Sequence, residues 1–377
     1  MDDASLLVAL LTGRPLALEG LGSVEWDAAV ALAVEHRLAP WLGARLKSRG
    51  VAVPEATAAW LDEIYLSSAA HNMQLFHELD RILVALRAAN IPVVLLKGAC
   101  LAKALYEDIA LRPMGDMDLW VQRPQLDAAR TVVQSLGYSA RARTDRPLAL
   151  QDALTGETQM FKEGAPLVEL HWNIFSGEWL RHTTRIDEQV MWRRSVAFSG
   201  SAARQLSPED AIIHLCVHLA VNHQMSGRSL RTLVDLDCAR RTWSVDWRTV
   251  AERAGAWRVS CATWIVLDAL AELFGDPDNQ LPLRDLAPSA LRQFILRRFA
   301  SLRMLANGLE LRGGPKRFLF LLSLVDRPAD AMVLVWRALF PDRLWLTLRY
   351  DLPDAASWRI WRLRVRHLLN VATRREV

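Results

Sequence analysis

A change in hydrophobic periodicity at Ile91 constrains the fold of this chain most strongly. Before it, apolar residues recur at three- and four-residue spacing, which predicts helices over Trp26–Arg49 and Glu55–Ala89. The β-branched and aliphatic run Ile91–Leu96 then predicts a short buried strand. After Ile174 the chain becomes mainly helical again. The sequence therefore predicts a small mixed α/β core between helical segments.

This pattern divides the 377 residues into four regions. They are a helical N-terminal region (1–90), an α/β core (91–200), a helical domain lining the cleft (201–280) and a basic, Trp- and Arg-rich helical C-terminal region (281–377). The predicted fold class is α+β and mostly helical, with a small mixed sheet flanked by helices at both ends of the chain.

Three acidic residues in the α/β core suggest chemistry. Asp116 and Asp118 begin a predicted strand at 116–121, so their side chains share one face. Glu169 lies in a second predicted strand, 167–172, which we expect to pair as a hairpin with 159–162. If the two strands are neighbours, three carboxylates converge, and a cation is needed to offset their repulsion. Oxygen ligands favour Mg²⁺, with Mn²⁺ as the alternative, and support two-metal phosphoryl or nucleotidyl transfer.

The turn Lys97-Gly98 precedes these acids and follows the first predicted strand. A strand, a glycine turn and the N-terminus of a helix together present free backbone N–H groups, which can hold phosphate. The alternative is an ordinary strand-to-helix turn with Lys97 in solvent.

Taken together, these segments resemble a bacterial family. The resemblance rests on Leu95-Leu96-Lys97-Gly98, Leu105-Tyr106, Arg112, Asp116-Met117-Asp118-Leu119 and Glu169-Leu170-His171-Trp172. They are similar to a poorly characterised nucleotidyltransferase family of the polymerase β-like superfamily, whose small mixed sheet is backed by helices.

The resemblance implies an NTP substrate, metal binding by Asp116 and Asp118, and Glu169 as the third catalytic and metal-binding carboxylate, beside the attacking hydroxyl. One departure concerns the turn, where the superfamily usually has Gly-Ser and a shorter gap to the paired acids. Here 17 residues separate Gly98 from Asp116. Lys97 or Arg112 is expected to replace the missing serine as a phosphate contact.

Arg112 and His171 each have a second interpretation. Arg112 can hold a phosphate bidentately or form an ion pair with Asp108 or Glu107. His171 follows Glu169 on the same strand face, where it can contact substrate, shuttle a proton or orient Glu169.

The helices beyond the core carry further candidates. Arg231 and Asp235 lie one helical turn apart. The resemblance to the family implies that both face the nucleotide. The alternative is an ion pair between them on the helix surface. His214 and His218 have zinc-ligand spacing, although polar packing on a helix lining the cleft is favoured.

Composition bounds the cellular setting and the partners. Four cysteines without CxxC spacing and an acidic N-terminus, where a signal peptide is basic, predict a cytoplasmic protein. No apolar stretch has the length of a membrane span, and contact of amphipathic helices with a membrane surface stays open. The net charge of +4 is uneven, −6 before residue 281 and +10 from there on.

Two functions follow from these residues. The first is a Mg²⁺-dependent enzyme that transfers an NMP from an NTP to a hydroxyl or phosphate of a small molecule, peptide or protein. The alternative is a catalytically inactive nucleotide-binding helical scaffold that acts through a protein partner. The sequence argues against nucleic acid as a partner, since it has no RNA-binding signature. It does not define the acceptor or the oligomeric state.

Overall fold

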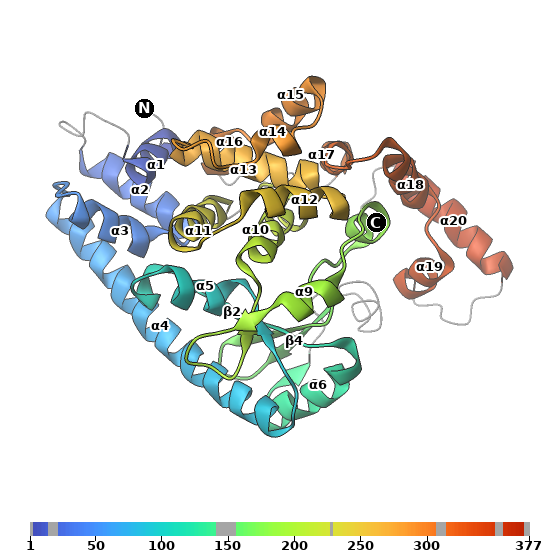
Figure 1. The fold of residues 1–377 in the computed structure, drawn as a ribbon, viewed down its shortest axis with the longest axis horizontal. Helices are drawn as coiled ribbons and strands as arrows, with labels where there is room; N and C mark the ends of the chain where they lie inside the picture. The colour runs from blue at the N-terminus through green and yellow to red at the C-terminus, as the bar shows by residue number, and fades with distance from the viewer. Residues whose placement is uncertain are drawn as a thin grey trace.

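One mixed sheet surrounded by helices makes up the described part of the chain (Figure 1). The structure is a computed structural model that describes residues 3–13, 22–140, 156–226, 229–306, 314–350 and 357–372. Helices predominate and the sheet is small, so the predicted α+β fold class is confirmed.

Helices precede, separate and follow the strands along the chain. Those of the first 140 residues are α1 (Asp3–Thr12), α2 (Ser23–Glu35), α3 (Ala39–Ser48), α4 (Glu55–Ala88), α5 (Lys97–Leu105), η1 (Ile109–Leu111), η2 (Arg123–Gln125) and α6 (Leu126–Ser135). Those that follow are α8 (Glu178–Thr183), α9 (Glu188–Arg194), α10 (Pro208–Val217), η3 (His218–Asn222), α11 (Ser229–Thr242), α12 (Trp247–Trp257), α13 (Ser260–Phe274), α14 (Leu283–Leu286), α15 (Ala290–Phe299), α16 (Leu302–Ala306), α17 (Gly314–Ser323), α18 (Pro328–Leu339), α19 (Arg343–Arg349) and α20 (Ser357–Ala372). Among the described residues, none of these helices combines the length and the apolar character needed to span a bilayer.

The sheet has the strand order β3-β4-β5-β2-β1-β7-β6. Its strands are β1 (Val94–Leu95), β2 (Asp116–Trp120), β3 (Ser139–Ala140), β4 (Glu157–Phe161), β5 (Leu167–His171), β6 (Val196–Ala197) and β7 (Arg204–Gln205). The central pair, β2 and β5, is parallel, and β4 pairs antiparallel with β5. The predicted hairpin and the predicted neighbourhood of the two acidic strands are therefore confirmed.

Three local predictions were wrong or incomplete. The predicted strand 91–96 is reduced to Val94–Leu95. The predicted helix Trp26–Arg49 is two helices, because the backbone at Arg37 takes φ +55° between α2 and α3. After Ile174, where a mainly helical chain was expected, β6 and β7 extend the sheet beyond β1, and strands of two residues leave no periodicity to detect.

The two faces of the sheet pack into different cores. Met117, Leu119, Val168 and Leu170 pack with apolar residues of α4 and α6. On the opposite face, Trp120 belongs to a second, larger core. Because side chains alternate along a strand, the acids of β2 and β5 lie on the face directed toward that larger core.

The larger core is helical and joins distant parts of the chain. Its fully buried members include Leu7, Leu42, Leu233, Trp264 and Phe320, from helices of the N-terminal region, the cleft domain and the C-terminal region. In Figure 1, α1 at the N-terminal end accordingly lies beside α16, against which it packs. The residues from α14 to α18 thus contribute to the main core despite their basic composition.

Helix α4 runs along the molecule from the N-terminal helices to the far end of the sheet (Figure 1). Midway along it, the buried side chain of Asn72 secures the segment that leads into β2. Its amide nitrogen donates to the carbonyl oxygens of Ile109 (2.6 Å) and Arg112 (3.0 Å). Its amide oxygen accepts from the backbone N–H of Met114 at 3.3 Å.

Replacing Asn72 by Ala should therefore destabilise the fold. Buried backbone groups left without partners cost about 1–3 kcal/mol each, so we expect a total loss of about 2–4 kcal/mol in urea unfolding. The exposed neighbour His71→Ala is the matched control and should change the unfolding free energy by less than about 0.5 kcal/mol. Equal stability of the two variants would contradict this role of Asn72.

Candidate active site

The parallel pairing of β2 with β5 assembles the three predicted carboxylates. Asp118 lies directly opposite Glu169, and Asp116 lies two residues earlier on the same face of β2. Asp118 is 4% exposed and Glu169 8% exposed. The sheet therefore places two negative charges where water solvates them poorly.

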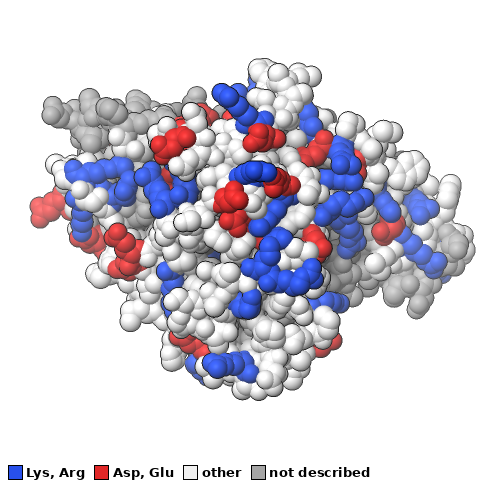
Figure 2. All heavy atoms as spheres, viewed as in Figure 1, with Lys and Arg blue, Asp and Glu red and all other residues white. Residues whose placement is uncertain are grey.

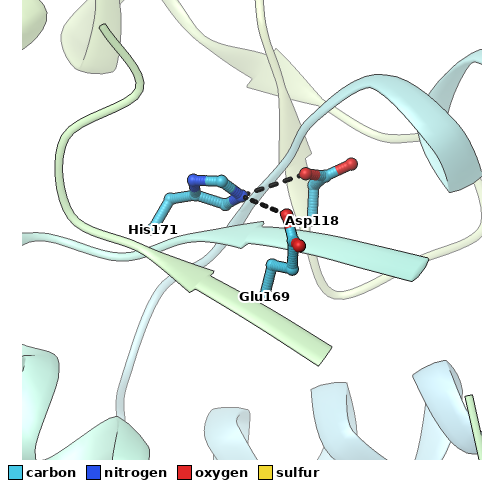
Figure 3. A group of neighbouring side chains, drawn as sticks. All are labelled: Asp118, Glu169 and His171. Carbon is cyan, nitrogen blue, oxygen red and sulfur yellow. Dashed lines mark hydrogen bonds and ion pairs between the residues drawn. The ribbon is translucent and has the colours of Figure 1, made fainter. Parts of the chain in front are cut away.

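Two cationic side chains lie against the Asp118 carboxylate. Lys97 Nζ and His171 Nε2 each lie 3.0 Å from Asp118 Oδ1. His171 Nε2 also lies 3.6 Å from Glu169 Oε2, and Figure 3 shows this ring nitrogen directed at both carboxylates. His171 thus bridges the acids of the two strands, and of its predicted roles this contact matches the orientation of Glu169.

These contacts shift the pKa values in opposite directions. Burial favours neutral Asp118, but Lys97 and His171 outweigh it and hold the pKa of Asp118 well below its usual range. Burial likewise opposes protonated His171, yet its hydrogen bonds to Asp118 and Glu169 raise its pKa to about 9. Burial, followed by Asp118 and Glu169, raises the pKa of Asp116. The site is therefore a charged network in which Asp118 and His171 are ionised near neutral pH.

The donor atoms also fit a divalent metal. Asp118, Glu169 and His171 each offer one ligand atom, and these atoms lie within 4.8 Å of one another. Two carboxylates with one imidazole form a mixed oxygen and nitrogen donor set, and His171 must lose its proton before its Nε2 can bind a metal. Asp116 lies outside this group, on the same strand face, so the structure brings together two of the three predicted metal ligands and adds His171.

The turn before α5 places Lys97 and Gly98 beside β2. Lys97 is the first residue of α5 and has φ +30°, in the left-handed region that side chains disfavour. A Cβ on Gly98 would lie 3.5 Å from the carbonyl oxygen of Asp116. The N-terminal N–H groups of α5 therefore begin next to the paired aspartates.

Arg112 is held by Asp235 rather than by Asp108 or Glu107. Its Nε and Nη2 donate to the two oxygens of Asp235 at 2.8 Å each, and Nη1 donates to the carbonyl oxygen of Gly98 at 3.1 Å. Tyr106 Oη donates to the same Asp235 carboxylate at 2.7 Å. This buried ion pair and the bond to Gly98 link α11 to the segment after η1 and to the first turn of α5, and all three guanidinium nitrogens of Arg112 donate hydrogen bonds.

Arg231 is not paired with Asp235 in this arrangement. Its Nη1 donates to the carbonyl oxygen of Pro113 at 3.2 Å, and Asp116 is among the carboxylates that attract it. Burial, followed by repulsion from Arg112, lowers the pKa of Arg231 to about 10. Arg231 therefore lies on the Asp116 side of the site.

His214 in α10 and His218 in η3 have the spacing of a zinc pair, but polar packing was the favoured prediction. Helix α10 changes into a π-helical turn, η3, which brings His218 Nε2 to 2.9 Å from His223 Nε2. His214 is buried, and burial lowers its pKa to about 3. Among the described residues, neither His214 nor His218 belongs to a group of three metal-ligand atoms. The favoured interpretation, polar packing, fits this geometry.

Sequence reasoning missed two polar residues on β4. Gln159 Nε2 donates to Glu169 Oε1 at 2.6 Å, and Glu157 Oε2 lies 3.5 Å from His171 Nδ1. Each lies opposite its partner in the antiparallel pairing of β4 with β5. The spacing of Glu157 and Gln159 was a usable signal, because residues two apart on a strand share a face, and here that is the face of Glu169.

A cavity of about 890 Å³ lies beyond the end of β5. It is lined by Trp172 and Asn173, which follow His171 directly, and by Arg123, Arg181 and Arg185. None of Asp116, Asp118 and Glu169 lines it, so this cavity is distinct from the carboxylate cluster.

Paired aspartates and a glutamate on one sheet face, beside the N-terminus of a helix, define a candidate site for phosphoryl or nucleotidyl transfer. The sequence agrees, since residues 22–275, more than half of the chain, match the family described as "Uncharacterised nucleotidyltransferase". The chain belongs to this family, and the resemblance inferred from its motifs is confirmed.

Two further comparisons add little. No curated protein matches the chain. Among solved structures, the chain is similar to the antibiotic-resistance factor ANT(2'')-Ia, with 14% identity and a TM-score of 0.28. That similarity covers 46% of this chain and 90% of the other. A likeness this distant carries no argument about the site.

The ionised state of His171 gives a testable pH dependence. Because its folded pKa of about 9 exceeds the ordinary histidine pKa of 6.5, its contacts stabilise the fold fully below pH 6.5. This contribution is lost as the pH rises from 6.5 through 9. NMR titration of the imidazole in metal-free protein with chelator should give the raised pKa, and Asp118→Asn should lower it. A wild-type value near 6.5 would contradict the bridge.

Proposed function

We propose that this chain is a metal-dependent nucleotidyltransferase that moves an NMP from an NTP to a hydroxyl or phosphate acceptor. The proposal rests above all on Asp116, Asp118 and Glu169, which occupy one face of two adjacent parallel strands. Membership in a nucleotidyltransferase family supports the reaction type. The acceptor belongs to a small molecule, a peptide or a protein.

In this proposal, the carboxylates of β2 and β5 have different roles in metal binding and in contact with the acceptor. Asp116 and Asp118 are the metal ligands that β2 supplies, and Glu169 is the third carboxylate, on the side of the acceptor. Mg²⁺ or Mn²⁺ bound there would offset the charge of the triphosphate and favour ionisation of the acceptor hydroxyl. Glu169 stays ionised, because His171 outweighs the effect of burial and lowers the pKa of Glu169, so it can accept a hydrogen bond from the acceptor hydroxyl.

The groups around α5 and α11 form the nucleotide side. The first N–H groups of α5, at Lys97 and Gly98, lie next to Asp116 and can donate to phosphate oxygens. The Lys97 ammonium, 3.0 Å from Asp118, supplies positive charge at the same place. Arg231 adds a guanidinium beside Asp116. Arg112 and Asp235 act by holding α5 and α11 in position.

The scaffold alternative has one observation in its favour. Lys97 and His171 already neutralise Asp118 within the protein, so the acidic cluster does not require a metal for stability. Calorimetry separates the two functions: an enzyme binds NTP more tightly with Mg²⁺, whereas a scaffold binds NTP equally well with chelator or fails to bind it.

Replacing Asp116 by Asn should abolish most of the transfer. Removing one charge-stabilising group from such a site typically costs about 10²–10³ in rate, so we expect at least a ~100-fold loss. The measurement is release of pyrophosphate and transfer of label from α-labelled NTPs to hydroxyl- and phosphate-bearing acceptors with Mg²⁺.

The matched control is Asp127→Asn on α6, whose side chain is 96% exposed. It removes the same charge far from the cluster and should leave the rate within about twofold. If Asp116→Asn transferred label as fast as Asp127→Asn, Asp116 would not be a metal ligand in the reaction.

A further inference from the structure

Helices α18, α19 and α20 form one end of the molecule, away from β2 (Figure 1). The inner side of α20 packs against the other two helices. Ile360 and Leu363 pack with Leu346 of α19. His367 Nε2 lies 2.9 Å from the carbonyl oxygen of Ala338 in α18. These three residues of α20 recur at helical spacing, so they mark the side of the helix that faces the protein.

The opposite side of α20 exposes large apolar side chains. Trp358, Trp361 and Val365 recur at the same helical spacing, and all three are exposed. The two tryptophans are 57% and 66% exposed. Single exposed apolar residues are common on any protein, whereas a group of large ones on one side of a helix indicates a contact surface.

Arginines lie beside this apolar stripe. Arg359, Arg362 and Arg366 are exposed, and no acidic residue occurs within Ser357–Ala372. The guanidinium groups of Arg359 and Arg362 lie 5.3 Å and 5.7 Å from the centroid of the Trp358 ring. Among the described residues, no carboxylate forms an ion pair with any of these three arginines. The positive charge on this side of α20 is therefore available to an anionic partner.

Helix α18 repeats this combination. Met332, Trp336 and Leu339 recur at helical spacing, and all three are exposed. A hollow of about 710 Å³ lies beside them and is lined by Met332 and Trp336, by Arg337 of the same helix and by Arg364 of α20. The two helices therefore share a surface on which exposed apolar side chains lie next to arginines.

We propose that the surface formed by the exposed residues of α18 and α20 binds an anionic lipid bilayer. Tryptophan favours the boundary between lipid headgroups and acyl chains, because its ring is apolar and its N–H is polar. The arginines beside it bind the phosphates of anionic lipids. Burying a guanidinium in hydrocarbon is costly, so α20 lies along the bilayer at the depth of the headgroups. This inference does not depend on the proposed function.

The charge of this surface favours a bilayer over a second copy of the chain. In a two-fold dimer the same surface of both copies meets, so arginines would face arginines. An anionic bilayer offers negative phosphates with an apolar layer directly beneath them. It therefore complements both the arginines and the tryptophans of α20.

Co-sedimentation of the full chain with lipid vesicles tests this inference. The vesicles contain phosphatidylcholine alone, or phosphatidylcholine with phosphatidylglycerol, which adds negative charge. We expect the partition coefficient to be at least about tenfold higher on the anionic vesicles. Raising the salt concentration to about 1 M should remove most of this difference, because the Debye length falls to about 3 Å.

Two double variants separate the apolar and the charged contributions. Trp358→Ser/Trp361→Ser and Arg359→Gln/Arg362→Gln should each lower the partition coefficient on anionic vesicles at least about fivefold. All four side chains are exposed, so both variants should keep the melting temperature of the wild type.

Matched controls remove similar side chains from other helices. Leu66→Ser/Met73→Ser removes two apolar side chains of α4 that are 65% and 66% exposed. Arg87→Gln/Arg248→Gln removes two exposed positive charges from α4 and α12. Both controls should bind anionic vesicles as the wild type does.

Three results would overturn the inference. They are equal binding by the surface variants and their controls, equal binding to the two kinds of vesicle, and failure to bind either kind. If binding failed and the sedimentation coefficient of the protein without lipid fell in Trp358→Ser/Trp361→Ser, the surface would belong to a contact with a second copy.

Discussion

The parallel pairing of β2 with β5 is the contact on which the candidate site depends. Its register sets Asp118 opposite Glu169 and, on the other face, Met117 opposite Val168. A shift of one residue in the register of this pair would direct the carboxylates into the apolar layer beneath α4 and α6. It would also direct the apolar side chains to the opposite face of the sheet. The same alternation that fills one core therefore also collects the acids on the opposite face.

Charge balance within the site comes from the protein itself. Lys97 and His171 share one oxygen of Asp118, so a metal that binds this oxygen competes with two cations already in contact with it. Such competition weakens the binding of a metal alone. In the proposed function, a bound triphosphate would attract the Lys97 ammonium and relieve this competition, which would couple metal binding to nucleotide binding. Figure 2 shows positive and negative side chains interspersed on one face of the molecule.

Local patterns predicted the carboxylates, because alternation and strand pairing fix which face a residue occupies. Asp116, Asp118 and Glu169 needed only this reasoning. The partner of Arg112 could not be found in this way, since Asp235 lies 123 residues further along the chain and nearer acids were available. The end of α2 near Arg37 could not be predicted either, because the apolar periodicity continues across the turn and arginine is not a typical residue for ending a helix. Whether the predicted site residues bind nucleotide stays a prediction.

The uneven charge of the sequence has a different meaning once the cores are known. The basic C-terminal region contributes Phe320 and Leu334 to the same helical core as Leu7 and Trp264, so its first role is structural. Positive charge near the paired aspartates comes instead from Lys97, Arg112 and Arg231, all outside that region. Lys97 lies in α5, Arg112 in the segment between η1 and β2, and Arg231 in α11, so their arrangement depends on the packing of these elements against one another. In the proposed function, the phosphate side of the site therefore forms only when the helical core and the sheet have packed together.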